Sequence, residues 1–147
     1  VWRVFWCKNI EHTMKSLAFI SFLAGIFLTP VLWAEDLFFE GDLVAAQKIA
    51  KSTRKLVMID FKAEWCGPCN RLDRTSWKDE NVISTLKDKA VAVKVDVDEN
   101  SELAAKYSIH SLPTVIFVDG NGNEVSRFIG YRDAEGFLKE FSKLEES

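Results

Sequence analysis

The run Trp65-Cys66-Gly67-Pro68-Cys69 decides the interpretation of this chain, because it places two thiols three residues apart. It directly follows an apolar, strand-like stretch at residues 56–61, Leu-Val-Met-Ile-Asp-Phe. If a helix begins at the run, positions i and i+3 share one face, so the sulfurs can close into a disulfide or open into a dithiol with little backbone movement. The sequence therefore predicts a redox-active cysteine pair on a strand-to-helix turn.

The two cysteines are expected to have different roles. Cys66 would lie at the helix N-terminus, where unpaired N–H groups and the positive end of the helix dipole favour a thiolate, and we predict that it is the nucleophile. Pro68 suits the first helical turn because its missing N–H has no partner to lose there. Cys69, one turn deeper, is the predicted resolving thiol.

A structural disulfide or half of a zinc site is the alternative interpretation of the pair. A zinc site usually takes four nitrogen or sulfur ligands, whereas the chain beyond residue 34 offers two thiols and His110. We therefore expect redox chemistry with no metal and no cofactor. His110 is interpreted as a residue on the rim of a groove, and the alternative is that it tunes Cys66.

Hydrophobic periodicity predicts alternating helices and strands. Helices are expected at residues 42–51, 66–76, 81–86 and 101–107 and after an N-cap at Asp133, and strands at residues 57–61, 90–97, 114–118 and 124–129. The segment Asp-Gly-Asn-Gly-Asn at residues 119–123 tolerates positive φ and predicts a hairpin. This order implies an α/β fold with a mixed central sheet and helices on both faces.

The sequence from about Lys55 to Leu144 resembles thioredoxins. Residues 63–69, Ala-Glu-Trp-Cys-Gly-Pro-Cys, are similar to the thioredoxin active-site stretch. Asp60 falls where thioredoxins carry a buried acid behind the site, and Lys94 where they carry its lysine neighbour. The resemblance implies the thioredoxin fold and thiol:disulfide exchange, with Lys94 and Glu64 as residues that modulate the site.

The resemblance also implies a substrate groove. Residues 111–114, Ser-Leu-Pro-Thr, match the segment whose cis proline lies against the two cysteines. The implied groove residues are Trp65, Gly67, Pro68, Leu112 and Gly130. The backbone of Leu112 would pair with an extended substrate segment. From the residues alone, Pro113 could simply lead a strand and Trp65 could be partly buried like many tryptophans.

Asp60 stands in an otherwise apolar strand, where burying a carboxylate is costly. One interpretation is a strand-end residue that faces solvent, because the strand alternates between two faces. Under the thioredoxin resemblance, desolvation raises its pKa, and it exchanges a proton with Cys69, directly or through water, as a mixed disulfide resolves.

The N-terminal part, residues 1–34, is expected to be an extension with a signal peptide at Met14 to Ala34, and residues 35–147 a single thioredoxin-like domain. The apolar core at residues 17–28 has a length typical of a signal and is short for a membrane span. An uncleaved anchor is the alternative, because Leu32 is an untypical residue before a cleavage site.

Cleavage would change the charge and the cysteine content. Loss of Arg3, Lys8, Lys15 and Glu11 leaves 16 basic and 21 acidic residues, a net charge of −5, which offers no general attraction to nucleic acid. Cys66 and Cys69 would then be the only cysteines, so they are not part of a disulfide-stapled scaffold. We expect a monomer.

Departures from classical thioredoxins shape the functional hypothesis. Lys62 and Asn70 replace the usual aromatic and basic residues, and residues 70–82 are more similar to the C-terminal periplasmic domain of the DsbD-type transmembrane reductase. We expect a periplasmic or otherwise extracytoplasmic reductase of protein disulfides, which receives electrons from a membrane thiol donor of the DsbD kind. The alternatives are a disulfide oxidase or isomerase, and a redox-inert binding module.

Overall fold

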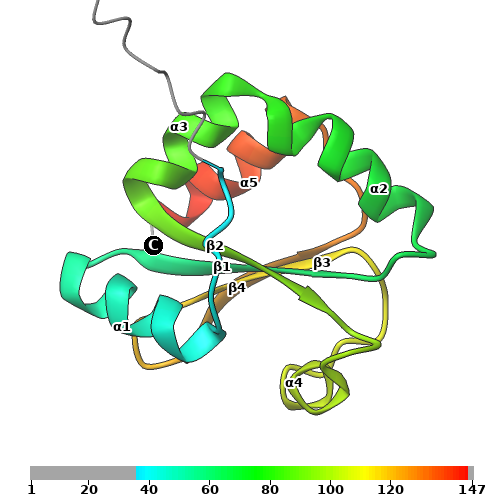
Figure 1. Cartoon of the computed structure of the whole chain (residues 1–147). Coiled ribbons are helices and arrows are strands. Elements are labelled where there is room, and N and C mark those ends of the chain that lie inside the picture. The colour runs from blue at the N-terminus through cyan, green and yellow to red at the C-terminus, as the bar shows by residue number, and fades with distance from the viewer. Residues whose placement is uncertain (1–35, 146–147) are drawn as a thin grey trace, which may run out of the picture. The chain divides into compact units, whose positions relative to one another are not determined.

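The computed structural model describes residues 36–145 (Figure 1). The expected signal peptide and the boundary after residue 34 lie outside these residues. Among residues 36–145, no helix combines the length and the apolar character needed to cross a membrane.

Helices and strands follow the predicted order. The helices are α1 (Leu43–Thr53), α2 (Gly67–Arg74), the 3₁₀ helix η1 (Ser76–Lys78), α3 (Glu80–Lys89), α4 (Ser101–Lys106) and α5 (Ala134–Glu145). The strands are β1 (Leu56–Lys62), β2 (Ala90–Asp96), β3 (Thr114–Val118) and β4 (Glu124–Ile129). The predicted elements are confirmed, and their ends move by a few residues.

The active-site helix is shorter than expected. It was predicted to run to residue 76, but α2 ends at Arg74 and the chain continues into η1. Thr75 leaves the helical region with φ −123° and ψ −85°, and its hydroxyl donates to the carbonyl of Arg71. Because the helix ends here, the following turn, which contains Trp77, can approach the sheet in a direction different from that of α2.

The four strands form one mixed sheet in the order β2-β1-β3-β4. β1 pairs in parallel with β2 and antiparallel with β3, and β3 pairs antiparallel with β4. Helices α2, α3 and α5 cover one face of the sheet, and α1 and α4 cover the other (Figure 1). The expected α/β fold with helices on both faces is therefore confirmed.

Strand β1 supplies both cores because its side chains alternate between the two faces. Val57, Ile59 and Phe61 join the core beneath α1 and α4, whereas Met58 joins the core beneath α2, α3 and α5. Asp60 shares the face of Met58 and is buried. The alternative in which Asp60 faces solvent is wrong, because helices cover the second face as well.

An aromatic cluster fixes α5 against the sheet and against η1. Phe137 of α5 is fully buried, and its ring centroid lies 5.1 Å from that of Trp77 and 5.7 Å from that of Phe128. Phe117 and Phe141 complete the cluster around it. Loss of the Phe137 side chain would leave a large cavity, because its neighbours belong to several helices and strands and cannot all move in to fill it.

We expect Phe137→Ala to lower the free energy of unfolding by about 3–5 kcal/mol, the usual cost of removing a buried phenylalanine side chain. Lys139→Ala, on the exposed side of the same helix, should change it by less than about 0.5 kcal/mol. Urea unfolding followed by circular dichroism measures both. A loss below about 1 kcal/mol for Phe137→Ala would contradict the proposed packing.

Candidate active site

The cysteine pair lies at the turn from β1 to α2. Cys66 and Cys69 are joined in a disulfide, and Cys66 is the N-cap residue of α2. Its Sγ accepts the backbone N–H of Cys69 at 3.2 Å, and Pro68 lies in the first turn. The prediction that Cys66 begins the helix is confirmed. The unpaired N–H groups at this end would stabilise a Cys66 thiolate after reduction.

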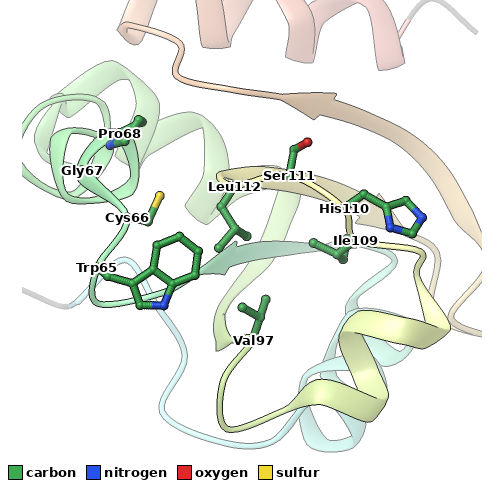
Figure 2. A pocket seen from close by; sticks show the side chains of 9 residues that line it. All are labelled: Trp65, Cys66, Gly67, Pro68, Val97, Ile109, His110, Ser111 and Leu112. Carbon is green, nitrogen blue, oxygen red and sulfur yellow. The ribbon is translucent and has the colours of Figure 1, made fainter.

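An open groove runs past the disulfide (Figure 2). It is lined by Trp65, Cys66, Gly67 and Pro68 from the motif, Val97 after β2, and residues 109–112 before β3. Cys66 belongs to this lining and Cys69 does not, although both residues are almost fully buried. A substrate in the groove would therefore meet Cys66 first.

Trp65 forms one wall of the groove. It is 71 % exposed, and its indole N–H donates to Oδ2 of Asp98 at 2.8 Å. Figure 2 shows its ring between Cys66 and Val97. The expectation of a platform beside the cysteines therefore fits the structure better than ordinary partial burial.

The opposite wall is built on Pro113. The Leu112–Pro113 peptide bond is cis, as the resemblance implied. Leu112 lines the groove, and Pro113 is buried behind it. Gly130, at φ 85°, donates its N–H to the carbonyl of Pro113 at 2.8 Å. Gly130, the residue that follows β4, thus supports this wall through a hydrogen bond, and it is not among the residues that line the groove.

Two of the predicted residues lie at the margins of the site. His110 is exposed at the far end of the groove from Cys66 (Figure 2), so the structure does not bring these two side chains together. Glu64 is exposed before the motif, and its carbonyl accepts from the side-chain amide of Asn70 at 3.1 Å. Within residues 36–145, no cluster of three His, Cys, Asp or Glu side chains is placed to hold a metal.

Asp60 is a buried acid, only 2 % exposed, on the face of the sheet that α2, α3 and α5 cover. Its Oδ2 accepts the indole N–H of Trp77 at 2.9 Å, and its Oδ1 has no hydrogen-bond partner among the described residues. Desolvation raises the pKa of Asp60 to about 6, against the lowering effects of the Trp77 hydrogen bond and the charge of Lys94. The carboxyl can therefore exchange a proton close to neutral pH.

Lys94 is the register neighbour of Asp60 on β2, but its ammonium pairs with Asp73 of α2. Lys62 pairs with the same carboxylate at 3.3 Å. Although partial burial opposes ionisation, the hydrogen bond and charge of Lys94, with those of Lys62, hold the pKa of Asp73 below its ordinary value. Lys94 therefore acts on Asp60 through its charge and not through a direct ion pair.

Sequence reasoning missed Asp73 and undervalued Trp77. Asp73 follows Cys69 by four residues, so helical spacing alone would have placed it on the same side of α2. Trp77 was expected to be a core or covering residue, and its burial confirms this. Nothing in the local pattern shows that its N–H reaches Asp60, because the contact joins residues 17 positions apart.

Comparison with known proteins agrees with this geometry. Residues 43–145 match the thioredoxin-like domain family, which is most of the chain. The chain belongs to this family. It is 40 % identical to mitochondrial thioredoxin of Bos taurus over 86 residues, which is 56 % of this chain and 49 % of that protein. The chain spans about half the length of the curated relatives it matches first.

Solved structures add two useful comparisons. A candidate disulphide-isomerase from Bacteroides thetaiotaomicron is 36 % identical with a TM-score of 0.66, over 75 % of this chain and 93 % of that one. The DsbH oxidoreductase has a TM-score of 0.67 over 74 % of this chain and 85 % of that one. At 16 % identity, this second likeness supports the fold alone.

We expect Asp60→Asn to stabilise the oxidised protein in a pH-dependent way. A carboxyl whose pKa is higher in the folded than in the unfolded chain costs nothing at low pH, where both forms are protonated. The cost grows between about pH 4 and 6 and is complete above pH 6, where a shift from 3.8 to about 6 corresponds to about 3 kcal/mol. Unfolding at pH 4 and pH 8 measures the difference.

Asp73→Asn is the matched control, because its pKa shift has the opposite sign. Its carboxylate contributes stability above its unfolded pKa and loses it as the pH falls, so this variant should be destabilised at pH 8 and nearly unaffected at low pH. If Asp60→Asn instead lost stability at pH 8, a favourable interaction of the Asp60 carboxylate would have to outweigh its desolvation.

Proposed function

We propose that this protein is a thiol:disulfide oxidoreductase that reduces disulfide bonds in protein substrates. The observation that carries the proposal is the Cys66–Cys69 disulfide at the N-terminus of α2, with Cys66 lining an open groove and Cys69 behind it. A structural disulfide does not need an N-capping sulfur in a groove wall. Membership of the thioredoxin-like family supports the same chemistry.

The reduced form would act in two exchange steps. The Cys66 thiolate attacks one sulfur of the substrate disulfide, which forms a mixed disulfide and releases the other substrate sulfur as a thiolate. The Cys69 thiolate then attacks Sγ of Cys66, releases the second substrate thiolate and restores the Cys66–Cys69 disulfide. Two electrons pass to the substrate, whose thiolates take up two protons.

Asp60 is the proposed proton acceptor for Cys69 in the second step. A buried thiol is a poor nucleophile until it loses its proton. A carboxyl with a pKa of about 6 is mostly ionised at neutral pH, so it can accept this proton and return it to solvent afterwards. Asp60 lies on the sheet face that α2, α3 and α5 cover and is not among the residues that line the groove, so it suits Cys69 better than the groove-lining Cys66.

The groove supports a protein substrate in an extended conformation. Trp65, Val97 and Leu112 offer an apolar surface beside Cys66. The cis Leu112–Pro113 bond lies at its edge, where the Leu112 backbone could pair with a substrate strand. This arrangement favours recognition of backbone and apolar side chains around a disulfide over recognition of one charged group.

We further propose that the protein is exported and works in the periplasm or an equivalent extracytoplasmic space, as a soluble domain after signal cleavage or anchored by an uncleaved N-terminal segment. The apolar run after Met14 is the support for export. In such a space the oxidised pair needs a membrane thiol donor, and the similarity of residues 70–82 to the DsbD-type domain points to a donor of that kind.

Disulfide isomerisation is the second candidate, because one well-matched solved structure is described as a candidate disulphide-isomerase. The two functions differ in reduction potential. The Gly-Pro dipeptide between the cysteines is similar to that of reducing thioredoxins, so we expect a potential nearer thioredoxin, about −270 mV, than the oxidant DsbA, about −120 mV. Equilibration with glutathione and quantification of the two forms gives the value. A potential above about −180 mV would favour an isomerase or oxidase.

Reduction of insulin tests the proposed activity directly. The wild-type protein with dithiothreitol should accelerate insulin precipitation, and Cys66→Ser should remove the acceleration, because it lacks the thiol that lines the groove. Cys69→Ser should accumulate a mixed disulfide with the substrate, since the resolving thiol is absent. The mixed disulfide is detected on a non-reducing gel.

Thr53→Ser, on α1 and outside the groove, is the control and should keep wild-type activity. A redox-inert binding module would be favoured if the folded wild-type protein did not reduce insulin and the folded Cys69→Ser variant formed no mixed disulfide.

A further inference from the structure

We propose that Trp77 is a positioning residue that holds Oδ2 of Asp60 through its indole N–H, so that the proton enters and leaves Asp60 at Oδ1. The catalytic meaning of this assignment rests on the proposed function, in which Asp60 accepts a proton from Cys69. The assignment itself concerns the two oxygens of one buried carboxyl and can be tested without any substrate.

The chemistry of the indole separates the two oxygens. An indole N–H can donate a hydrogen bond but cannot accept one. When Asp60 is protonated, the oxygen that accepts from Trp77 is best kept as the carbonyl oxygen, which is a stronger acceptor than a hydroxyl oxygen. The proton is therefore directed to Oδ1, the oxygen with no hydrogen-bond partner among the described residues.

The indole is held in place by its surroundings. Trp77 is buried, its ring meets Phe137 of α5 edge-on at 5.1 Å, and it meets Phe38 at 6.0 Å. A rotation that moved the N–H away from Asp60 would disturb both contacts. It would also leave a polar hydrogen buried without an acceptor, which is unfavourable.

The charged groups near Asp60 are held by one another. Lys94 on β2 and Lys62 on β1 both pair with Asp73 on α2, and residue 115, opposite Asp60 on β3, is valine. None of the ion pairs found within residues 36–145 includes Asp60. The neutral donor Trp77 is therefore its direct polar contact, and the lysines act only through their charge.

This contact explains why the position holds tryptophan. The ring of Trp77 packs against the apolar rings of Phe38 and Phe137, and a phenylalanine in its place would preserve most of this packing. The indole adds one feature that phenylalanine lacks, the N–H that reaches Asp60. Trp77→Phe therefore removes the hydrogen bond and retains an aromatic ring.

The first experiment uses the wild-type full chain in its oxidised form. Nuclear magnetic resonance would follow the Trp77 indole N–H and the Asp60 carboxyl carbon from pH 4 to 8. We expect both signals to titrate with one midpoint near 6, and the indole N–H to stay protected from solvent exchange on both sides of it. Loss of that protection when Asp60 is protonated, or an indole signal insensitive to the midpoint, would overturn the assignment.

The second experiment measures resolution in a Cys7→Ser background, which removes the additional thiol. Reduced protein is mixed with Ellman's reagent in a stopped-flow instrument. Attack by Cys66 releases one thionitrobenzoate, and attack by Cys69 on the mixed disulfide releases the second. The second phase reports resolution and its pH dependence.

Trp77→Phe removes a hydrogen bond that favours the ionised form of Asp60, so the midpoint should rise by about one pH unit or more. Resolution should slow about fivefold at pH 6 and remain unchanged at pH 9, where Asp60 is ionised in both proteins. In an Asp60→Asn background, Trp77→Phe should cause no pH-dependent change. An unchanged midpoint in a folded Trp77→Phe variant would overturn the proposal.

Phe141→Leu is the matched control. It removes aromatic packing from the same cluster, where Phe141 contacts Phe117 and Phe137, but it leaves the Trp77 N–H intact. Phe141→Leu should lower the free energy of unfolding and leave the titration midpoint of Asp60 unchanged. If its midpoint shifted as much as in Trp77→Phe, the effect would come from packing, and the proposal would be overturned. If Trp77→Phe does not fold, the titration of the Trp77 indole N–H and the Asp60 carboxyl carbon in the wild-type protein tests the proposal by itself.

The outcomes separate this proposal from the proposed function. If the protein reduces no disulfide but the indole and carboxyl signals titrate together with retained protection, the Trp77 assignment stands and the reductase function falls. If the protein reduces insulin but the indole ignores the ionisation of Asp60, only the Trp77 assignment falls.

Discussion

The burial of one carboxyl group, Asp60, is the constraint on which the site depends. Helices on both faces of the sheet leave β1 without a solvent-exposed side, so an acid in this strand must be desolvated. Desolvation keeps the proton on the carboxyl up to about pH 6. The surrounding elements are arranged to tolerate this group without neutralising it, since they give it one neutral donor and no ion-pair partner within the described residues.

Helix α2 connects this buried acid to the groove. Its N-terminus holds the disulfide, with Cys66 in the groove wall, and its last turns carry Asp73, which holds Lys94 and Lys62. One short helix thus orders three environments: the groove wall that contains Cys66, a place for Cys69 away from the groove lining, and an ion network that includes two lysines. The helix ends at Thr75, and the chain turns there so that the indole N–H of Trp77 in η1 reaches Asp60.

The sequence predicted most of what depends on short-range patterns. Residue periodicity located the strands and the α-helices other than α2, which the motif placed with Cys66 at its start, but it did not predict η1. The contact between Trp77 and Asp60 and the pairing of Lys94 with Asp73 could not be predicted in this way. Both depend on how α2 and η1 cross β1 and β2, which is a property of packing between elements and not of any local spacing.

The placement of Lys94 shows why such details decide the chemistry. A lysine paired directly with Asp60 would stabilise the carboxylate, lower its pKa and leave an acid that does not exchange a proton near neutral pH. Asp73 prevents this by holding the ammonium in its own ion pair. The protein therefore retains a buried carboxyl whose charged form is disfavoured and which no ion pair among the described residues neutralises, as is common where a residue is kept for reactivity. The buried acid, the indole donor and the lysine held by Asp73 together set the pH range in which Asp60 gains or loses its proton.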